Sequence, residues 1–566
     1  MVNILGVSAF YHDSSACLVR DGEIIAAAQE ERFSRIKHDN SYPTQSIDYC
    51  LSEAGNPKVD AIVFYENPKL KHDRVLKTFQ SYPQNLKNFK KALKSQEKKI
   101  NLTDGMEYVD HHISHAASAF YPSPFRSAAI VTIDGVGEWD TTTISIGMDN
   151  KIEKISSIEF PNSIGMLYSA FTYFCGFKVN NGEYKLMGLA PYGRPVYAQK
   201  ILDNMIDLKE DGSYALNLDY FGYHNSERII SDKFCELFKL PKRQNESKLT
   251  EEYCNIAASI QAVTELIVLK ICSHARNITG QDNLCLAGGV ALNCVANGKI
   301  ENSGLFKNIW IQPAAGDAGG SLGAALHYYY SKGNPRKISK NDSMKSSYLG
   351  PSYDEEIVTF LKENSIEYEK LSIKTIAEHL SNEKVVGWYQ GRMEFGPRAL
   401  GNRSILGDAR SEKMQSIMNL KIKFRESFRP FAPIVLKEDC RKYFELNSES
   451  PYMLMVSKVK DSKRKNLKKS SSFDVMDVLK NGGYRSTLPA VTHVDNSARI
   501  QTIDEKNGKI HELLSEFKKI TGTGVLINTS FNVRGEPIVC TPEDAYDCFV
   551  NSGMDYLVMG DYIVGK

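Results

Sequence analysis

A chain of 566 residues is longer than one hydrophobic core supports, so its length predicts two or three domains. Lys plus Arg number 70 and Asp plus Glu 68, and this near-balance gives no electrostatic reason to expect a nucleic-acid partner. The 11 cysteines are scattered and never spaced C-x-x-C, and neither a signal peptide nor about 20 consecutive apolar residues is recognisable, so we expect a cytoplasmic protein without a membrane partner.

The first 30 residues alternate in the manner of a three-stranded β-meander, with a tight turn at Asp21-Gly22. The strands expected there are residues 3–8, 15–19 and 23–29. A similar order returns near residue 130, where an acidic, glycine-bearing loop follows the first strand. The strands expected in this second copy are residues 129–133, 141–147 and 151–157. We interpret the repeat as an internal duplication of strand, acidic loop, strand, turn and strand.

Helical patterns fill most of the remaining N-terminal half, and the clearest amphipathic helix is expected over residues 253–277. Further strands are expected over residues 61–65 and 283–287. The polar stretch from 332 to 353 has no apolar period and indicates a linker, placed at 341–353 between domains 1–340 and 354–566. The second domain is expected to be α/β, with a solvated loop in its lysine-rich segment 458–469.

His111 and His115 are four residues apart, so on a helix they share one face. Two imidazoles on one face can bind a divalent metal ion. The zinc-protease form of this motif needs Glu directly after the first histidine, and here His112 occupies that position. Spacing alone favours the other interpretation, a pair of helix histidines satisfied by hydrogen bonds.

Two acidic loops could complete a metal site. Asp134 opens a turn that contains Gly135 and Gly137, and Asp317 precedes an apolar helix that begins with small residues. A carboxylate in either position can meet a metal ion or a metal-bound phosphate. An isolated aspartate there is more often a turn or N-cap residue, so spacing leaves both interpretations open.

A third glycine-rich element runs from a strand through Gly288-Gly289 to Asn293. Adjacent glycines between a strand and a helix let the backbone approach a flat or anionic ligand closely. The run matches neither the Walker A loop nor G-x-G-x-x-G, so neither the P-loop nor the Rossmann fold is supported. Together with the duplicated meander, it suggests the actin-like phosphotransferase architecture, in which nucleotide binds between two duplicated halves.

The C-terminal domain is dense in side chains that bind anions. The candidates are Arg398, Lys423, Arg425, Arg499, Ser530, Asn532 and Arg534. On a strand, Lys423 and Arg425 would share a face. The planar fork of arginine suits phosphate and carboxylate. Scattered surface arginines are the alternative for each position, but their place beside Gly, Pro and Asn favours an anion site.

Several ordered motifs match a known family. They are residues 6–8, residues 12–16, Glu30-Glu31-Arg32-Phe33, the His111 segment, Thr132-Ile133-Asp134-Gly135, residues 182–190 and Phe395-Gly396-Pro397-Arg398. Through them the sequence resembles the nodulation and antibiotic O-carbamoyltransferases (NodU/CmcH type, tobramycin-carbamoyltransferase-like) over nearly its whole length. One departure is Asp495-Asn496-Ser497, where the family often has Asp-Gly-Ser; asparagine tolerates a positive φ better than most residues.

The resemblance implies an α/β protein of two parts. The N-terminal domain is expected to be a duplicated actin-like (ASKHA) domain, similar to the universal tRNA-threonylcarbamoyl transferase subunit (Kae1-like). The C-terminal domain is expected to resemble threonylcarbamoyl-adenylate synthase (YrdC-like). In this chemistry the C-terminal domain converts carbamoyl phosphate and ATP, with Mg²⁺, into carbamoyl-adenylate and pyrophosphate. The N-terminal domain then moves the carbamoyl group to a hydroxyl of a small molecule, and a homodimer is also expected.

The resemblance also assigns roles to residues. Fe²⁺ or another divalent ion is expected at His111, His115 and Asp317, with Asp134 as a fourth ligand. The synthase signatures K-x-R and S-x-N correspond to Lys423, Arg425, Ser530 and Asn532. The residues expected to contact the nucleotide or phosphate substrates elsewhere are Gly135, Gly137, Lys185, Gly288, Gly289, Asn293, Arg398, Arg499 and Arg534. His12, beside Asp13, is the candidate base for the acceptor hydroxyl, and a structural histidine in a turn is equally open.

Two other functions stay open. A tRNA-modifying enzyme of the threonylcarbamoyl type would suit the two-domain fusion, but the near-neutral charge and the lack of a basic terminal arm count against it. An actin-like sugar kinase, or a nucleotide-dependent regulatory protein, would leave the C-terminal signatures without a purpose. The acceptor itself cannot be derived from the sequence, because the shape of a pocket decides it, and antibiotic, alkaloid and glycan acceptors all stay open.

Overall fold

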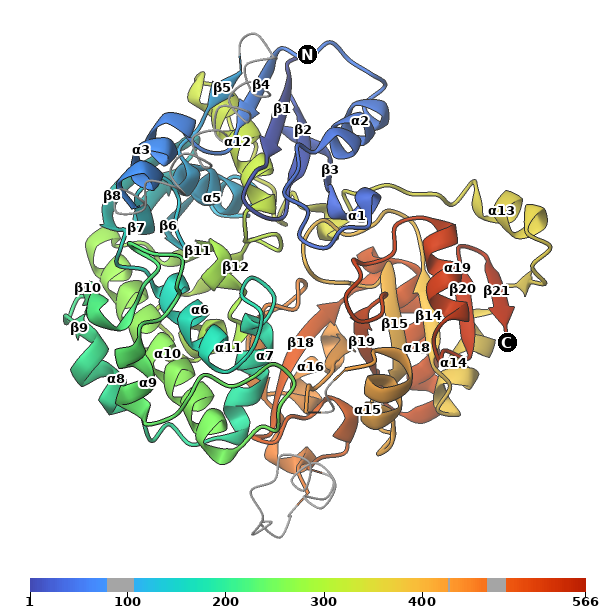
Figure 1. The fold of residues 1–566 in the computed structure, drawn as a ribbon. Coiled ribbons are helices and arrows are strands. Elements are labelled where there is room, and N and C mark those ends of the chain that lie inside the picture. Colours follow the sequence, from blue (N-terminus) through green and yellow to red (C-terminus); the bar gives the residue numbers. More distant parts are fainter. Residues whose placement is uncertain (79–105, 426–427, 466–484) are drawn as a thin grey trace. The chain divides into compact units, whose positions relative to one another are not determined.

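The computed structural model describes residues 1–78, 106–425, 428–465 and 485–566 (Figure 1). The chain forms two compact units. Unit 1 contains Met1–Glu30 and Asn40–Ser343, and unit 2 contains Glu31–Asp39 and Met344–Lys566. Unit 2 therefore includes a short segment from near the N-terminus, which no feature of the sequence indicated. The domain boundaries at 340 and 354 stay a prediction, and residues 466–469 of the lysine-rich segment lie outside the described residues.

Unit 1 contains two five-stranded sheets with the same topology. Their strand orders are β3-β2-β1-β4-β5 and β8-β7-β6-β11-β12. In each sheet the first three strands in the chain are antiparallel neighbours, and two later strands run parallel to the first. The strands are β1 (Asn3–Ser8), β2 (Ser15–Arg20), β3 (Glu23–Gln29), β4 (Ala61–Phe64), β5 (Glu107–Tyr108), β6 (Ser127–Ile133), β7 (Asp140–Met148), β8 (Lys151–Glu159), β11 (Asn283–Ala287) and β12 (Asn308–Ile311). The repeated topology confirms the predicted duplication and is that of the actin-like fold.

Helices surround these sheets. They are α2 (Thr44–Glu53), α3 (Pro68–Thr78), α5 (His111–Phe120), α6 (Ile164–Phe174), α7 (Glu183–Leu189), α8 (Ala198–Met205), α9 (Asp232–Phe238), α10 (Glu251–Thr279), α11 (Cys294–Ser303) and α12 (Ala318–Ser331). A small hairpin pairs β9 (Ile206–Leu208) with β10 (Tyr214–Leu216). The predicted helix over 253–277 is confirmed as α10. All 11 cysteines are free, in agreement with the absence of a predicted disulfide framework.

Among the described residues, α10 alone is long and apolar enough to cross a membrane by length and composition. This differs from the expectation that no stretch approaches that length. The most apolar window of α10 is 61% buried inside the protein, as in a core helix. Its buried face includes Ile256, Ile260, Val263 and Ile267, and their spacing of three and four residues produces one apolar side.

Helix α12 approaches its neighbours at backbone distance because its contacting residues are glycines. A Cβ atom added to Gly323 would lie 1.8 Å from the carbonyl oxygen of Ser114 in α5. A Cβ on Gly6, in β1, would lie 1.8 Å from the carbonyl oxygen of Ser321 in α12. Figure 1 shows α12 beside β1, β2 and α5. The small residues at the start of α12 therefore bring two helices and a sheet into direct contact.

Unit 2 is built on a mixed nine-stranded sheet with the order β13-β21-β20-β14-β15-β19-β16-β18-β17. Its strands are β13 (Glu369–Lys370), β14 (Val386–Tyr389), β15 (Arg403–Asp408), β16 (Ala432–Leu436), β17 (Met455–Lys458), β18 (Ser497–Ile503), β19 (Val525–Ser530), β20 (Tyr556–Met559) and β21 (Tyr562–Gly565). Its helices are α1 (Glu31–Ser34), α13 (Ile357–Glu363), α14 (Ile373–Ser381), α15 (Met414–Ile417), α16 (Cys440–Tyr443), α18 (Lys509–Thr521) and α19 (Pro542–Val550). The predicted α/β class is confirmed, and the likeness of this unit to YrdC stays a prediction.

Apolar side chains of α14 and α18 pack on the central strands of this sheet. Trp388 of β14, Ile434 of β16 and Phe517 of α18 belong to one buried cluster. Residues on the inward sides of both helices repeat every three or four positions, which places them on a single face of each helix. This core fixes the strands whose ends carry the predicted anion-binding residues.

The contact at Gly323 yields a stability prediction. We expect Gly323→Ala to destabilise unit 1 by about 3 kcal/mol, because the added methyl overlaps a backbone oxygen that cannot move alone. Gly188→Ala in α7 is the matched control, since a Cβ there meets nothing within 4 Å. Thermal unfolding followed by circular dichroism measures both variants. Equal midpoints for the two would contradict the claim that this contact constrains the fold.

Candidate functional site

The four predicted metal ligands lie together inside unit 1. His111 and His115 project from α5, Asp134 follows β6, and Asp317 stands directly before α12. All four are buried, and one ligand atom of each lies within 4.8 Å of the others. The site thus joins elements that are up to about 200 residues apart in the chain, because the duplicated sheets and α12 bring them together.

The distances within this group are short. The Nε2 atom of His111 lies 3.1 Å from Oδ2 of Asp134 and 3.8 Å from Oδ1 of Asp317. The Nε2 atom of His115 lies 3.5 Å and 3.9 Å from the same two oxygens. Two ligands of one ion, each at roughly 2.1 Å from it, are at most about 4.2 Å apart. The four distances between a histidine nitrogen and an aspartate oxygen all lie below this limit, as they do between ligands of one divalent ion.

Two of the converging atoms have no hydrogen-bond partner. They are Nε2 of His115 and Oδ1 of Asp317, and both are buried. A buried polar atom without a partner costs free energy, so a native structure needs a reason for each one. A cation between an imidazole nitrogen and a carboxylate oxygen would satisfy both. Two imidazoles with two carboxylates suit Fe²⁺, Mn²⁺ or Zn²⁺, so the residues fit the implied metal ion.

Neither aspartate uses its side chain simply as a turn or N-cap residue, the alternative that the sequence left open. Asp317 stands at the N-cap of α12, but its side chain accepts no capping hydrogen bond from that helix. Its Oδ2 instead accepts a bond from the hydroxyl of Tyr65 at 3.3 Å. Oδ1 of Asp134 accepts the backbone N–H of Gly289 at 2.9 Å, which leaves Oδ2 directed at the two histidines. Both carboxylates are thus held with one oxygen toward the centre of the group.

The pKa values follow from this concentration of buried charge. Burial alone would lower the pKa of His111, but Asp134 and Asp317 outweigh it and raise that pKa to about 9. Burial would raise the pKa of Asp134, yet the hydrogen-bonded imidazole of His111 and the nearby imidazole of His115 hold it well below its usual range. His112 faces Thr132 at 2.6 Å instead, and burial with two neighbouring histidines lowers its pKa.

His12 and Asp13 lie at the edge of the same group. His12 Nδ1 is 2.9 Å from Oδ2 of Asp13, and its Nε2 is 3.7 Å from Oδ2 of Asp317. Burial would lower the pKa of His12, but Asp317 and Asp13 raise it to about 10. The imidazole is therefore protonated at neutral pH in the metal-free site, and it is directed at the predicted ligands.

Three charged residues of this site were missed by the sequence analysis. Glu138 is buried and accepts hydrogen bonds from the backbone N–H of His111. Glu66 follows β4, and its Oε2 lies 4.0 Å from Nδ1 of His111. Burial lowers the pKa of Arg74, while the neighbouring Glu66 and Glu138 act in the opposite direction. Glu138 could have been found, because it stands four residues after Asp134 in the acidic loop.

Three of the predicted glycines pack closely against the residues of this site, where a side chain would not fit. A Cβ on Gly137 would lie 2.9 Å from the ring of His111, and one on Gly289 would lie 2.8 Å from Oδ1 of Asp134. Gly288 has φ 88°, and a side chain there would meet the carbonyl of Ile133 at 2.3 Å. Gly135, by contrast, has only the sulfur of Met166 nearby, at 3.9 Å.

Asn293 and Lys185 lie elsewhere in unit 1. Asn293 caps α11 and exchanges amide hydrogen bonds with Gln261, so its side chain is used within the fold. Lys185 lies in α7 with its ammonium 5.7 Å from the ring centre of Phe177. Their proposed contact with nucleotide stays a prediction.

In unit 2 the structure brings three of the predicted residues together. Nζ of the buried Lys423 lies 2.5 Å from the carbonyl of Ser530 and 2.8 Å from Oδ1 of Asn532. It also approaches the Ser530 hydroxyl at 3.3 Å and the Asn532 carbonyl at 2.9 Å. The ammonium thus fixes the turn that follows β19.

The expectation that Lys423 and Arg425 could share one face of a strand is wrong. Lys423 follows a π-helical turn over Met418–Ile422, and Phe424 has φ 47°, so the backbone between the two cations is not that of a strand. Burial lowers the pKa of Lys423 well below its usual value, and Arg425, Lys37 and Arg429 lower it further. Because the three other cations each lower the pKa of Lys423, we name the four residues the cation cluster (Lys37, Lys423, Arg425, Arg429).

The other predicted residues of unit 2 are spread over its loops. Arg398 follows Gly396, whose carbonyl accepts a bond of 2.8 Å from the buried Arg32 of the Glu31–Asp39 segment. Arg499 lies on β18, and Arg534 is exposed beyond β19. Asn496 has φ 63°, so the asparagine takes the left-handed backbone that the family's glycine would take.

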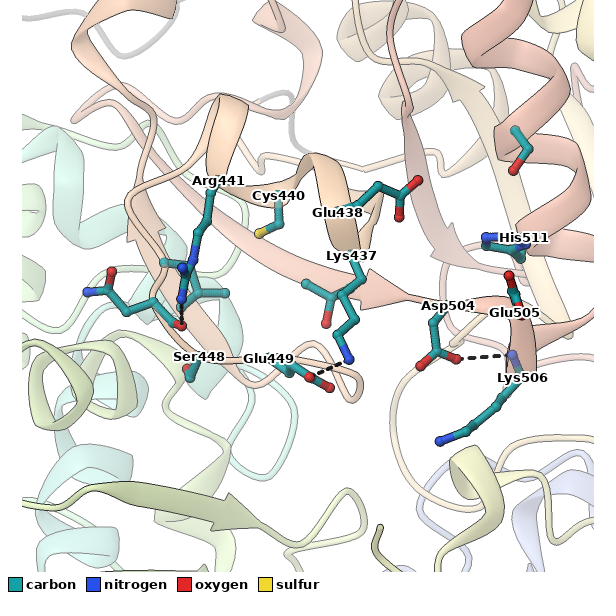
Figure 2. Close-up of a pocket in the computed structure, with 14 residues that line it drawn as sticks. Lys437, Glu438, Cys440, Arg441, Ser448, Glu449, Asp504, Glu505, Lys506 and His511 are labelled. Atoms are coloured by element: carbon teal, nitrogen blue, oxygen red, sulfur yellow. Dashed lines mark hydrogen bonds and ion pairs between the residues drawn. The ribbon is translucent and has the colours of Figure 1, made fainter. Parts of the chain in front are cut away.

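A cavity of about 740 Å³ lies in unit 2, lined by residues such as Lys437, Glu449 and Asp504 (Figure 2). The residues that line the cavity follow the ends of β16 and β18. Ser530, which Lys423 contacts, lies beside the beginning of β16, so the cavity and Lys423 are at opposite ends of this strand. Its charges are largely used within the protein: Lys437 pairs with Glu449 at 2.5 Å, and Arg441 donates to the carbonyl of Asn447. None of the predicted site residues lines this cavity.

Comparison with known proteins identifies the family. The family described as carbamoyltransferase N-terminus matches residues 3–326, and the family described as carbamoyltransferase C-terminus matches residues 377–566. The chain therefore belongs to the carbamoyltransferase family and is a transferase enzyme.

Its relatives cover nearly all of it. An uncharacterized protein of Synechocystis is 53% identical over 100% of this chain and 97% of its own length. Nodulation protein NolNO of Sinorhizobium fredii is 37% identical over 99% of this chain and 80% of its own length. The 3'-hydroxymethylcephem-O-carbamoyltransferase of Streptomyces clavuligerus is 26% identical over 93% and 92%. The solved structure of T. kodakarensis HypF, 15% identical over 59% of this chain and 48% of HypF, has a TM-score of 0.31, too low to compare folds.

The ligand geometry yields a binding prediction. We expect the wild-type protein to bind one divalent ion and to be stabilised by about 2.7 kcal/mol when the free ion is at 100 times its Kd. Asp317→Asn should lose most of this effect, because it removes a carboxylate charge from the group. Asp110→Asn is the control, since this exposed aspartate precedes His111 without capping α5. Unfolding temperatures with and without Fe²⁺ or Mn²⁺ decide the matter, and ion stabilisation of Asp317→Asn equal to that of wild type would exclude this site.

Proposed function

We propose that this protein is an ATP-dependent O-carbamoyltransferase that carbamoylates a hydroxyl of a small molecule. The observation that carries the ATP-dependent step is the cation cluster around Lys423. Carbamoyl phosphate and ATP are both polyanions, and a site that binds them together must offset their mutual repulsion. Burial is the main cause of the lowered pKa of Lys423, but Arg425, Lys37 and Arg429 lower it further, so positive charge is concentrated there and would attract an anion.

The first half-reaction is assigned to unit 2. Water cleaves carbamoyl phosphate to carbamate and phosphate, and a carbamate oxygen then attacks the α-phosphorus of ATP, which releases pyrophosphate. The products are carbamoyl-adenylate, pyrophosphate and phosphate. Arg425 and Arg398 are proposed to bind phosphate oxygens through their planar guanidinium groups. Lys423 is proposed to hold Ser530 and Asn532 beside these anions.

The second half-reaction is assigned to the buried group in unit 1. A divalent ion held by His111, His115, Asp134 and Asp317 would supply Lewis-acid polarisation of the carbamoyl group. The acceptor hydroxyl attacks the carbamoyl carbon, AMP leaves, and the hydroxyl proton passes to a base. His12 lies within reach of this site, and Asp317 and Asp13 raise its pKa to about 10, so it favours the protonated form while the charge of Asp317 is not offset. Its role as the base therefore requires a cation beside Asp317.

The names of relatives support the proposed class of acceptor. One relative is named for transfer to the oxygen of a hydroxymethylcephem, and others are nodulation proteins. We therefore propose an antibiotic, alkaloid or glycan hydroxyl as the acceptor, with Fe²⁺ as the ion and Mg²⁺ accompanying ATP. A cytoplasmic location, a homodimer, and function without nucleic-acid or membrane partners belong to the same proposal.

Pyrophosphate release tests the first half-reaction. We expect release from ATP to depend on carbamoyl phosphate, because without carbamate no nucleophile is present to attack the α-phosphorus. The measurement is pyrophosphate formed by the full-length protein with ATP and Mg²⁺, with and without carbamoyl phosphate. Release at the same rate with and without carbamoyl phosphate would contradict the proposed function.

Variants test the division between the two sites. The double variant His111→Ala with His115→Ala should lose carbamoyl transfer while it keeps carbamoyl-phosphate-dependent pyrophosphate release. Arg425→Ala should lower pyrophosphate release by about 100-fold, because it removes a charge that stabilises the transition state. Lys421→Ala, an exposed lysine four residues before Arg425, is the matched control and should keep both. Equal loss of both half-reactions in the two test variants would contradict the division.

A further inference from the structure

Glu138 caps a helix from which it is separated by 27 residues in sequence. Helix α5 has Asp110 at its N-cap, and the Asp110 side chain makes no capping hydrogen bond. The backbone N–H of His111 instead donates to Oε1 of Glu138 at 2.9 Å and to Oε2 at 3.1 Å. The unpaired N–H groups at a helix start favour a carboxylate, and Glu138 supplies it from another loop.

The same carboxylate also binds the backbone of the residue directly before α3. Oε1 of Glu138 accepts the backbone N–H of Asn67 at 2.6 Å, just beyond β4. Glu138 is 5% exposed, so these bonds are not shared with bulk water. One side chain therefore joins the start of α3, the start of α5 and the acidic loop of the second sheet.

Glu138 and Asp134 belong to one closed loop. The N–H of Asp134 donates to the carbonyl of Thr141 at 2.9 Å, and the N–H of Gly137 donates to that of Asp140 at 2.9 Å. The position of Glu138 is thus fixed relative to Asp134, while its carboxylate fixes the backbone of His111. The side chain of His111 also rests against Gly137, where even a Cβ would come within 2.9 Å of its ring.

We propose that Glu138 is the positioning residue that sets the distance between Asp134 and His111 for divalent-ion binding, an inference that rests on the metal site of the proposed function. A helix start without its cap frays, and the first residue of α5 is itself a ligand. Without Glu138 the backbone of His111 is no longer held in place, so the position of its imidazole varies although no ligand has been removed. Loss of such a supporting partner costs about 10- to 100-fold in metal affinity.

The chain offers a matched control in its other duplicated half. Glu30 is 3% exposed and accepts the backbone N–H of Ser46 at 2.8 Å and that of Gln45 at 3.2 Å. These bonds cap α2, whose N-cap Pro43 has no side-chain cap of its own. Glu30 therefore performs the same structural task on a helix that carries none of the four ligands.

The experiment compares Fe²⁺ affinity, measured anaerobically by competition with a chromophoric chelator, in wild type, Glu138→Ala, Glu138→Gln and Glu30→Ala. Mn²⁺ serves as a parallel probe, and unfolding midpoints record stability. We expect Glu138→Ala to bind about 10- to 100-fold more weakly, and Glu30→Ala to bind as wild type at a comparable loss of stability. Glu138→Gln keeps one acceptor oxygen, so its affinity should lie between those of wild type and Glu138→Ala.

Several results would overturn the inference. Wild-type affinity in Glu138→Ala would do so, as would an equal loss in Glu30→Ala, because affinity would then only follow stability. If Glu138→Ala does not fold, Glu138→Gln decides by the same comparison, and wild-type affinity there rejects the role. A wild-type protein that binds neither ion rejects the proposed metal site itself, whereas equal binding by wild type and Glu138 variants rejects only the positioning role.

Discussion

The contact on which the N-terminal site depends is the backbone approach of α12 to α5 at Gly323. Any side chain at that position would collide with the carbonyl of Ser114, one residue before His115. Since Asp317 stands at the start of α12, the separation of the two helices sets how near its carboxylate lies to the imidazoles. Gly6 fixes the other side of α12 against β1 in the same way. The glycines therefore determine the geometry of a site in which none of them takes part chemically.

Helix α5 is held at both ends by charges that oppose its dipole. Glu138 binds the N-terminal N–H, and Arg336 donates to the carbonyls of Phe120 at 2.7 Å and Tyr121 at 3.1 Å at the C-terminal end. An anion at the start and a cation at the end each stabilise a helix. This arrangement matters because α5 buries three histidines among carboxylates, a combination that is costly without strict placement of every partner. The charges that hold both ends of α5 thus also keep its buried histidines in place among the carboxylates.

Much of the fold and of the metal site could be predicted from the sequence, and what could not be predicted has physical causes. The strands of both meanders were predicted to within two residues, because alternation and turn glycines are local signals. Asp317 could not be separated from an ordinary N-cap, since the two differ only in where the side chain points. The strand suggested for Lys423 and Arg425 failed because a positive φ at Phe424 leaves no mark in the residue pattern. Glu138 and Arg74 were missed because their roles arise from contacts between distant segments.

The segment Glu31–Asp39 has a consequence for how the protein is made. It leaves the ribosome early, yet it belongs to the unit whose remaining residues begin at Met344. Arg32 and Arg35 of this segment donate to the carbonyls of Gly396 and Ile538, so their partners are synthesised several hundred residues later. Domains usually fold in order as they emerge. Here a segment that is synthesised within the first unit completes the second unit only later. The two units are consequently interleaved along the chain, and a fragment that starts at the apparent linker would lack nine residues of its own unit.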